Sequence, residues 1–279
     1  MKERQLSSFE DFEDTVLALL DEDRKSRGES RVRVSPVLFR GQASDRWKLE
    51  TTLERYADWQ YGLEKYYHVM RVIKPSVESC TGKNWKDLPA YSPEQDEIPA
   101  APQGYEFMAY LRHNGFPSPL LDWTRSFYVA AFFAFQDTKG DAQNVAIYSY
   151  IEYGNGGKEG SGAARIGSLG PTIRTDERHF LQQSEYTFCS KPIKGFHGDR
   201  VYCSHEEVFA LGREDQDILT KFTIPRAERP KVLDRLRMMN ITAYSLFNSE
   251  ESLLKDLAYE EIERRSRRRV LEDGGNQGE

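Results

Sequence analysis

The sequence predicts an α+β fold in which a mixed or split β-sheet is flanked by helices. Two observations lead to this prediction. Five short segments spread along the chain have the composition of strands. Amphipathic segments at both ends, and a further helical segment between them, have the apolar spacing of helices that cover a sheet. With 279 residues, the chain is long enough to bury a sizeable core in one or two domains.

The five expected strands are Val34–Phe39, Leu120–Thr124, Val145–Ile151, Gln182–Phe188 and Ile218–Ile224. Pro225 ends the last of them, because proline has no backbone N–H to donate to a neighbouring strand. Side chains alternate along a strand, so Gln183 and Glu185 are expected on one face of the fourth strand. Gln182 and Ser184 are expected on the other face.

Helices are expected within residues 1–30, from Thr52 toward Ile73, and from Glu250 to Arg269. A proline-rich stretch, residues 75–103, has little periodicity and is expected to be a long loop. These features divide the chain into an N-terminal helix over residues 1–30, a main domain over residues 31–260, and a basic helix end with a frayed tail over residues 261–279.

Composition and charge exclude several classes of protein. The net charge is −6, so no overall field draws the chain onto nucleic acid or an acidic membrane. No apolar run approaches the roughly 20 residues that span a bilayer, and the N-terminus lacks the apolar core of a signal peptide. Three widely spaced cysteines indicate neither a disulfide framework nor a zinc site, and no metal-binding motif is present. A cytoplasmic protein without a metal is expected.

The least generic stretch of the sequence runs from Tyr110 to Phe135. Two prolines break its first helical part, a short buried strand follows, and Thr124 or Ser126 can cap an apolar helix. Polar side chains at the edge of such a core are held stiffly, as a functional site requires. The candidates are His113, Asp122, Trp123, Thr124, Arg125 and Ser126. A purely structural role remains the alternative for each of them.

A second candidate lies at Arg40-Gly41-Gln42, at the end of the first expected strand. Gly41 allows a sharp turn or the close approach of a ligand. The planar guanidinium of Arg40 is well suited to hold an anion at such a position. The alternative is an ordinary surface arginine in a turn.

Four segments in this order resemble the FRG-domain family of bacteria and phages. They are Leu38–Gln42, His113–Ser126, Phe180–Phe188 and Asn240–Phe247. The resemblance covers roughly residues 30–260. The chain differs from the usual family pattern at Pro119, and it has Ser184 followed by Glu185 where the family usually has glycine after two glutamines.

The family's motif order is similar to that of ADP-ribosyltransferases, whose split-sheet cleft binds NAD. The resemblance implies NAD as the substrate and cofactor, with no metal. It implies an NAD-binding set that consists of Arg40, Gly41, Gln42, Asp122, Trp123, Thr124 and Ser126. Arg40, Glu185 and Gln183 are the expected catalytic residues, with a carboxylate or amide stabilising the oxocarbenium character that develops at the ribose. Aromatic side chains at Trp123, Phe127 or Tyr128 can stack on nicotinamide.

The resulting hypothesis is an NAD-dependent ADP-ribosyltransferase that acts as a toxin or an anti-phage defence effector. Its acceptor is RNA, the favoured choice, or another nucleic acid or a protein. Aromatic residues after position 55 and the arginines near the C-terminus support a nucleic acid, whereas the net charge opposes it. A toxin also requires a neutralising antitoxin as a partner. The alternatives are a non-catalytic module that binds a nucleotide or peptide, and an NAD glycohydrolase.

Overall fold

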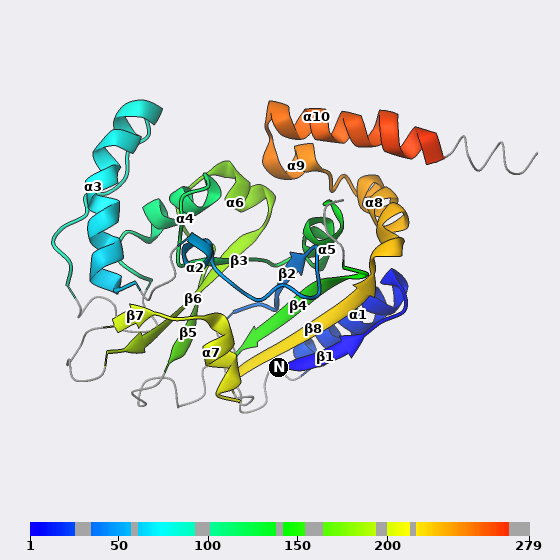
Figure 1. Cartoon of the computed structure of the whole chain (residues 1–279), viewed down its shortest axis with the longest axis horizontal. Coiled ribbons are helices and arrows are strands. Elements are labelled where there is room, and N and C mark those ends of the chain that lie inside the picture. Colours follow the sequence, from blue (N-terminus) through cyan, green and yellow to red (C-terminus); the bar gives the residue numbers. More distant parts are fainter. Residues whose placement is uncertain are drawn as a thin grey trace, which may run out of the picture.

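A mixed β-sheet forms the centre of the computed structural model, which describes residues 1–25, 35–56, 61–92, 101–137, 142–153, 164–193, 200–212 and 216–267 (Figure 1). Its described strands are β1 Lys2–Gln5, β2 Leu38–Gln42, β3 Leu121–Thr124, β4 Asn144–Glu152, β5 Arg165–Leu169, β6 Ser184–Pro192, β7 Arg200–Tyr202 and β8 Asp217–Pro225. Their order is β1-β8-β4-β2-β3-β6-β5, and β7 pairs with β6. The β1–β8 pair is parallel and the other pairs are antiparallel, so the expected α+β fold with a mixed sheet is confirmed.

The sheet is weakly joined between its two central strands. β2 pairs with β4 along its whole length, and β3 pairs with β6 along its whole length. Among the described residues, Phe39 and Thr124 form the single pair in the register between β2 and β3. The two strands therefore diverge beyond this pair, and the sheet consists of two halves that meet there.

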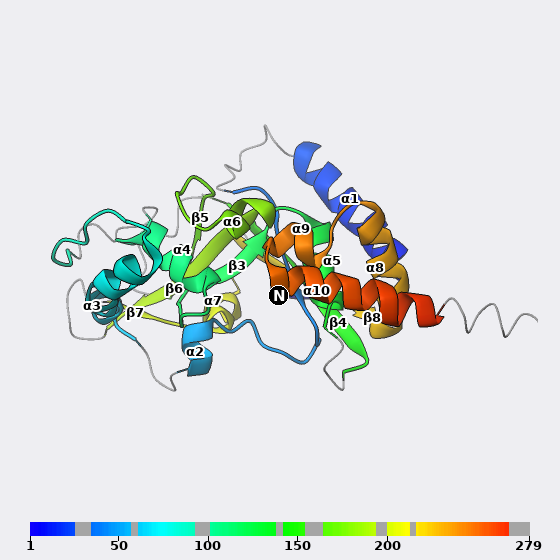
Figure 2. The same cartoon turned by 90° about the horizontal axis from the view of Figure 1, so that it is seen from above.

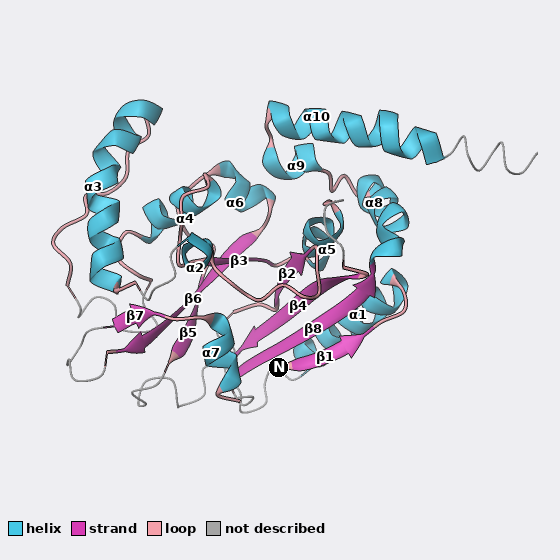
Figure 3. Ribbon diagram, viewed as in Figure 1, coloured by secondary structure: helices cyan, strands magenta, loops and turns pink. Residues whose placement is uncertain are grey.

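Helices cover the sheet on both halves (Figure 3). The described α-helices are α1 Phe9–Lys25, α2 Thr52–Tyr56, α3 Leu63–Thr81, α4 Tyr105–His113, α5 Phe127–Phe135, α6 Glu177–Leu181, α7 His205–Ala210, α8 Arg229–Met238, α9 Ala243–Phe247 and α10 Glu250–Ala258. A 3₁₀ turn, η2 Arg226–Glu228, precedes α8, and a π-helical segment, η3 Tyr259–Arg264, follows α10. Seen from above, α1 and α8 lie toward one end of the molecule and α3 and α4 toward the other (Figure 2).

Each half of the sheet has its own hydrophobic core. On the β1-β8-β4-β2 half, α1, α5 and α8 bury a cluster in which Phe12 packs edge-on against Phe127 and Phe222. On the β3-β6-β5 half, α3 and α4 bury a second cluster that includes Tyr66 and Tyr186. Because these two clusters are separate, each wall of the region between β2 and β3 is supported by a different set of helices.

The strands also bury a third cluster, which contains Leu38, Trp123 and Tyr150 together with Val208 of α7. Side chains alternate along a strand, so Leu38 and Trp123 project from the opposite face to Phe39 and Thr124. The central strands are thus buried on both faces.

Helix α5 lies directly on the backbone of β2 at Gly41. A Cβ atom built on Gly41 would stand 1.9 Å from the carbonyl oxygen of Ala130 and 2.7 Å from the backbone nitrogen of Ala134. The glycine was expected to allow a turn or the approach of a ligand, but it lies inside β2 and makes room for the helix. Ser126 caps α5, with its hydroxyl oxygen accepting a hydrogen bond from the Val129 N–H at 3.3 Å.

Several expected boundaries were wrong. Arg40, Gly41 and Gln42 lie within β2 instead of at its end, and the expected start of that strand at Val34 lies outside the described residues. Gln182 and Gln183 precede β6, which begins at Ser184.

Two further segments contain helices. The long loop expected over residues 75–103 is helical up to Thr81, since α3 continues through Pro75, and residues 93–100 lie outside the described residues. The segment Asn240–Phe247, the last of the four motifs, contains helix α9. Strands β1 and β5 were not expected.

Elements near both ends of the chain contribute to the fold. β1 belongs to the sheet, and α1 contributes Phe9, Phe12 and Val16 to the first core cluster. Helix α10 and η3 confirm a closing helix from Glu250, while residues 268–279, with the expected tail, lie outside the described residues. In the part of the chain that the structure describes, no helix combines the length and apolar character needed to span a bilayer.

The contact between α5 and β2 makes Gly41→Ala a test of the fold. The added methyl group collides with backbone atoms, which cannot rotate away, so α5 must move. We expect the free energy of unfolding to fall by about 3 kcal/mol, the upper part of the usual range for overpacking. Urea unfolding monitored by circular dichroism measures the change.

Gly167→Ala is the matched control, because Gly167 also lies in a strand and is buried. A Cβ atom there would meet its nearest neighbour, Cε1 of Phe188, at 3.6 Å, an ordinary contact. We expect a change of less than about 1 kcal/mol. Equal losses in the two variants would contradict the close approach of α5 to Gly41.

Candidate functional site

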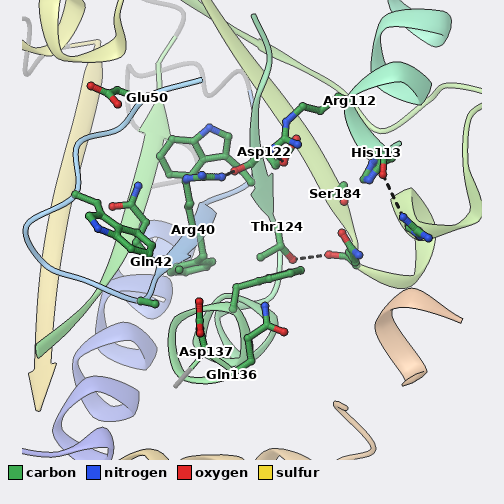
Figure 4. A pocket seen from close by; sticks show the side chains of 18 of the residues that line it. Arg40, Gln42, Glu50, Arg112, His113, Asp122, Thr124, Gln136, Asp137 and Ser184 are labelled. Carbon is green, nitrogen blue, oxygen red and sulfur yellow. Dashed lines mark hydrogen bonds and ion pairs between the residues drawn. The ribbon is translucent and has the colours of Figure 1, made fainter. Parts of the chain in front are cut away.

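A cavity of about 870 Å³ lies where β2 and β3 diverge (Figure 4). Six of the residues expected to bind NAD line it, namely Arg40, Gly41, Gln42, Asp122, Trp123 and Thr124. They come from two strands whose sequences are about 80 residues apart. The volume falls within the range of small-molecule and cofactor sites, roughly 300–1,000 Å³.

Arg40 spans the gap between the two halves of the sheet. Its Nη1 donates a 2.8 Å hydrogen bond to the backbone carbonyl oxygen of Asp122 in β3. Burial lowers the pKa of Arg40 to about 10, so the guanidinium stays cationic at neutral pH. Its Nε is enclosed and has no hydrogen-bond partner among the described residues. The side chain is therefore an incompletely neutralised cation in a buried position.

Asp122 is fixed by a neighbouring helix. Its Oδ2 lies 2.5 Å from Nη2 of Arg112, at the end of α4, and both side chains are mostly buried. Its Oδ1 is enclosed without a hydrogen-bond donor among the described residues, and so is Nε of Arg112. The ion pair with Arg112 therefore keeps the Asp122 carboxylate in a fixed orientation.

The lining carries an excess of positive charge. The cationic side chains are Arg40, Arg46, Lys48, Arg55, Arg112 and Arg178, and the carboxylates are Glu50, Asp122 and Asp137. Such a lining attracts anions, and the planar forks of the arginines match phosphate oxygens. The cavity therefore fits a ligand that carries phosphate groups.

Aromatic side chains lie at the same cavity. Trp47 lines it and is 51% exposed, so part of the residue is accessible to a ligand. Phe133 and Phe247 also line it, with their rings edge to face at 5.9 Å. Exposed aromatic faces can stack on a base or a nicotinamide ring.

The aromatic residues expected to stack on nicotinamide are placed differently. Trp123 lines the cavity but is 2% exposed, and its Nε1 donates a 2.8 Å hydrogen bond to Oγ1 of Thr187. Phe127 and Tyr128 pack in the first core cluster and are not among the lining residues.

Thr124 and Ser126 do not face the cavity together. Thr124 lines the cavity and donates from Oγ1 to the Gln182 carbonyl oxygen at 2.7 Å. Thr124 Oγ1 also accepts a hydrogen bond from the backbone N–H of Ser126 at 3.1 Å. Ser126 caps α5 and does not line the cavity. Its expected role in binding thus has no geometric support.

Glu185, an expected catalytic residue, does not line the cavity. It stands opposite Trp123 in the register and therefore projects from the other face of β6 than Ser184, which does line the cavity. It is 1% exposed, and its Oε1 lies 3.8 Å from Nε of Arg125. Burial raises the pKa of the Glu185 carboxyl to about 7, and the charge of Arg125 opposes this rise.

Gln183, the other expected catalytic residue, is exposed and also lies outside the cavity. It has a left-handed backbone, with φ of 49°, in the turn between α6 and β6. The expectation that it shares a strand face with Glu185 was wrong for this reason. Its neighbour Gln182 is buried and lines the cavity, with Nε2 donating to the Leu246 carbonyl oxygen at 3.1 Å.

Sequence reasoning missed Arg112, Arg178, Trp47 and Phe247 as lining residues. Phe247 is the last residue of the fourth motif, and Arg112 directly precedes the second motif, which begins at His113. Their positions in or next to a motif were the signal that could have identified them. Trp47 lies in an irregular stretch after β2 with no such signal. Only the fold brings it to the cavity.

The arginines near the C-terminus are engaged within the protein. Arg264 lies 2.7 Å from Glu260, Arg265 contacts Glu261, and Arg267 donates to the Tyr259 hydroxyl. Arg268 and Arg269 lie outside the described residues. Within the described ranges, no group of three or more His, Cys, Asp or Glu side chains is arranged to hold a metal ion.

One comparison with known proteins gives a match. Residues 35–143 match the FRG domain. The matched range contains β2, β3 and the cavity-lining part of α4, although it is shorter than the range of about 30–260 over which the motifs were recognised. No curated protein and no solved structure matches the chain.

The buried carboxyl of Glu185 predicts a pH-dependent stability. Its pKa in the folded protein, about 7, lies above the ordinary value of 4.5. As pH rises between these values, the unfolded chain releases the proton and the folded protein retains it, so the free energy of unfolding falls. At about 1.4 kcal/mol per pKa unit, the loss is about 3.5 kcal/mol and is complete above pH 7.

Glu185→Gln removes this loss, because the amide is neutral at every pH. Relative to the unmodified protein, the variant should gain about 2–3 kcal/mol in unfolding free energy between pH 5 and pH 8, measured by urea unfolding. Arg125→Ala should act in the opposite sense and weaken the protein more at pH 8 than at pH 5. A stability difference for Glu185→Gln that is the same at both pH values would show that the carboxyl titrates normally.

Proposed function

Because residues 35–143 match the FRG domain and the divergence of β2 and β3 forms a cationic cavity, we propose that this protein is an NAD-dependent ADP-ribosyltransferase. The observation that carries the proposal is Arg40, a buried arginine that faces the cavity from β2 and spans the gap in the sheet. The motif order that places an arginine on an early strand of a split sheet is the one that resembles ADP-ribosyltransferases.

In the proposed complex, cationic side chains bind the pyrophosphate of NAD and an aromatic side chain stacks on one of its rings. The pyrophosphate carries two negative charges, which match the guanidinium of Arg40 and the cationic side chains around it. Trp47, which is about half exposed, is the aromatic side chain proposed to stack on a ring of the dinucleotide. Gln42 is oriented by a 3.1 Å hydrogen bond from Nε2 to the Lys48 carbonyl oxygen. Its Oε1 has no hydrogen-bond partner among the described residues.

The carboxylate best placed to act on the ribose is Asp122. Cleavage of the glycosidic bond gives the ribose oxocarbenium character, which a fixed negative charge stabilises. Asp122 lines the cavity and is held by Arg112, whereas Glu185 lies on the other face of the sheet. In the proposed enzyme Asp122 has the electrostatic role first expected for Glu185 or Gln183.

The proposed acceptor is a nucleic acid, with RNA favoured, or a protein, and the biological role is that of a toxin or an anti-phage defence effector. Cationic side chains around the cavity support an RNA acceptor, although the arginines described near the C-terminus are already paired. Such an effector requires a neutralising partner. Helix α10 and η3 expose Leu254, Leu257 and Ile262, an apolar set of the kind that a protein partner covers.

A second candidate function is a nucleotide-binding module without turnover. It is favoured by one specific observation, the position of Glu185 and Gln183 outside the cavity. In this alternative Arg40 is required for binding and no carboxylate is required for activity.

The first test combines calorimetric titration with NAD and transfer of label from NAD to a cell lysate separated into protein, RNA and DNA. Arg40→Ala should weaken NAD binding roughly 10- to 100-fold, the usual effect of losing a hydrogen bond to a charged group, and abolish transfer. Arg40→Lys keeps the charge but loses the planar fork, and should weaken binding less. Asp122→Asn should retain NAD binding and lose most of the transfer.

Arg71→Ala is the control, since Arg71 is exposed on α3 and does not line the cavity. It should bind and transfer like the unmodified protein. NAD bound but neither consumed nor transferred would favour the binding module. NAD consumed without labelled acceptor would indicate a glycohydrolase, and no binding of NAD would refute the proposal.

A further inference from the structure

A chain of hydrogen bonds leads from the cavity into the second core cluster. His113, at the end of α4, lines the cavity beside Arg112 and Ser184 (Figure 4). Its Nε2 lies 2.5 Å from the hydroxyl oxygen of Tyr186, which in turn lies 3.0 Å from Nδ1 of His179. Nε2 of His179 lies 3.0 Å from the backbone carbonyl oxygen of Pro171. The chain thus ends on a group that can only accept a hydrogen bond.

That end group determines where each proton lies. The Pro171 carbonyl requires a proton on Nε2 of His179, so Nδ1 of the neutral ring is an acceptor. Tyr186 therefore donates its hydroxyl proton to His179, and its oxygen accepts from Nε2–H of His113. Neutral His113 is left with its lone pair on Nδ1, for which no hydrogen-bond partner is present among the described residues.

The surroundings keep His113 neutral near pH 7. Burial lowers the pKa of His113 below its ordinary value of 6.5, and the charge of Arg112 acts in the same direction. Asp122 and Asp176 oppose this effect, and the pKa of His179 is itself lowered by burial. Nη1 of Arg178 donates a hydrogen bond to the backbone carbonyl oxygen of His113, so this guanidinium also lies near His113.

We propose that His113 is the general base of the transfer reaction and that Tyr186 and His179 are positioning residues that fix its tautomer. The inference rests on the proposed function and adds to it the residue that activates the acceptor. In the reaction, Nδ1 of His113 takes the proton of an acceptor O–H or N–H. The acceptor's electron pair forms the new bond to C1′ of the ribose, and the electrons of the C1′–N bond leave with neutral nicotinamide. The imidazolium then returns its proton to water.

The tautomer can be measured without any substrate. Nitrogen-15 NMR of the histidine side chains should show His113 with the proton on Nε2 and a pyridine-like Nδ1, assigned from the signal that disappears in His113→Asn. Tyr186→Phe removes the fixing hydroxyl, so the His113 signal should shift toward a mixture of the two tautomers. A proton on Nδ1 of His113 in the unmodified protein would overturn the assignment.

Kinetics then test the role of the base. His113→Asn should lower kcat for transfer about 100-fold, the usual contribution of a general base, while NAD affinity by calorimetry changes less than about 3-fold. The unmodified protein should show a rise of kcat/KM with pH whose midpoint lies below 6.5, and this limb should be absent in His113→Asn. Tyr186→Phe should lower kcat by a smaller factor, about 10-fold, and move the midpoint of the limb.

The outcomes separate this inference from the function on which it rests. Transfer that is intact in His113→Asn but lost in Arg40→Ala would reject the base and leave the transferase in place. Loss of NAD binding in His113→Asn, with an unchanged melting temperature, would assign the residue to binding instead of proton transfer. Absence of transfer by the unmodified protein would reject both proposals.

Discussion

The hydrogen bond from Arg40 to the backbone of Asp122 is the interaction on which the site depends. Where two strands diverge, the facing backbone groups lose their partners, and a buried carbonyl without a donor is costly. The guanidinium supplies the missing donor from the side of β2 and stays charged while doing so. The same side chain therefore closes the sheet and creates the positive potential of the cavity.

The charged side chains around this interaction are held in fixed positions, but their hydrogen-bonding atoms are not all paired. Arg112 holds one oxygen of Asp122, yet enclosed nitrogen and oxygen atoms on both side chains lack hydrogen-bond partners among the described residues. When every polar atom of an ion pair has a partner, the pair exerts little electrostatic field on a ligand. Arg112 and Asp122 have unpartnered atoms among the described residues, so they can still act on a ligand electrostatically. Glu185 contrasts with them, since its burial beneath the sheet raises its pKa and reduces its charge.

Local pattern determined much of the fold and part of the site. The strands at β4 and β8 and the capped apolar helix α5 followed from residue type, whereas the common cavity of Arg40, Asp122 and Thr124 was expected from the family resemblance. The place of Glu185 relative to the cavity did not follow, because alternation along β6 separates Glu185 from Ser184 without telling which of the two faces lines the cavity. Trp47 and Phe247 reach the cavity through long-range packing, which no local spacing encodes.

The single pair described between Phe39 and Thr124 has a thermodynamic consequence, because the helices on the two halves of the sheet bury separate clusters and the halves are otherwise joined through the third cluster. A ligand that contacts Arg40 on β2 and Asp122 on β3 adds contacts at the place where the described strands share a single residue pair. Its binding free energy therefore adds directly to the free energy that holds the two halves together, and the loaded protein resists unfolding in proportion to the logarithm of ligand concentration. Occupancy of the cavity and the free energy of unfolding are in this way thermodynamically linked.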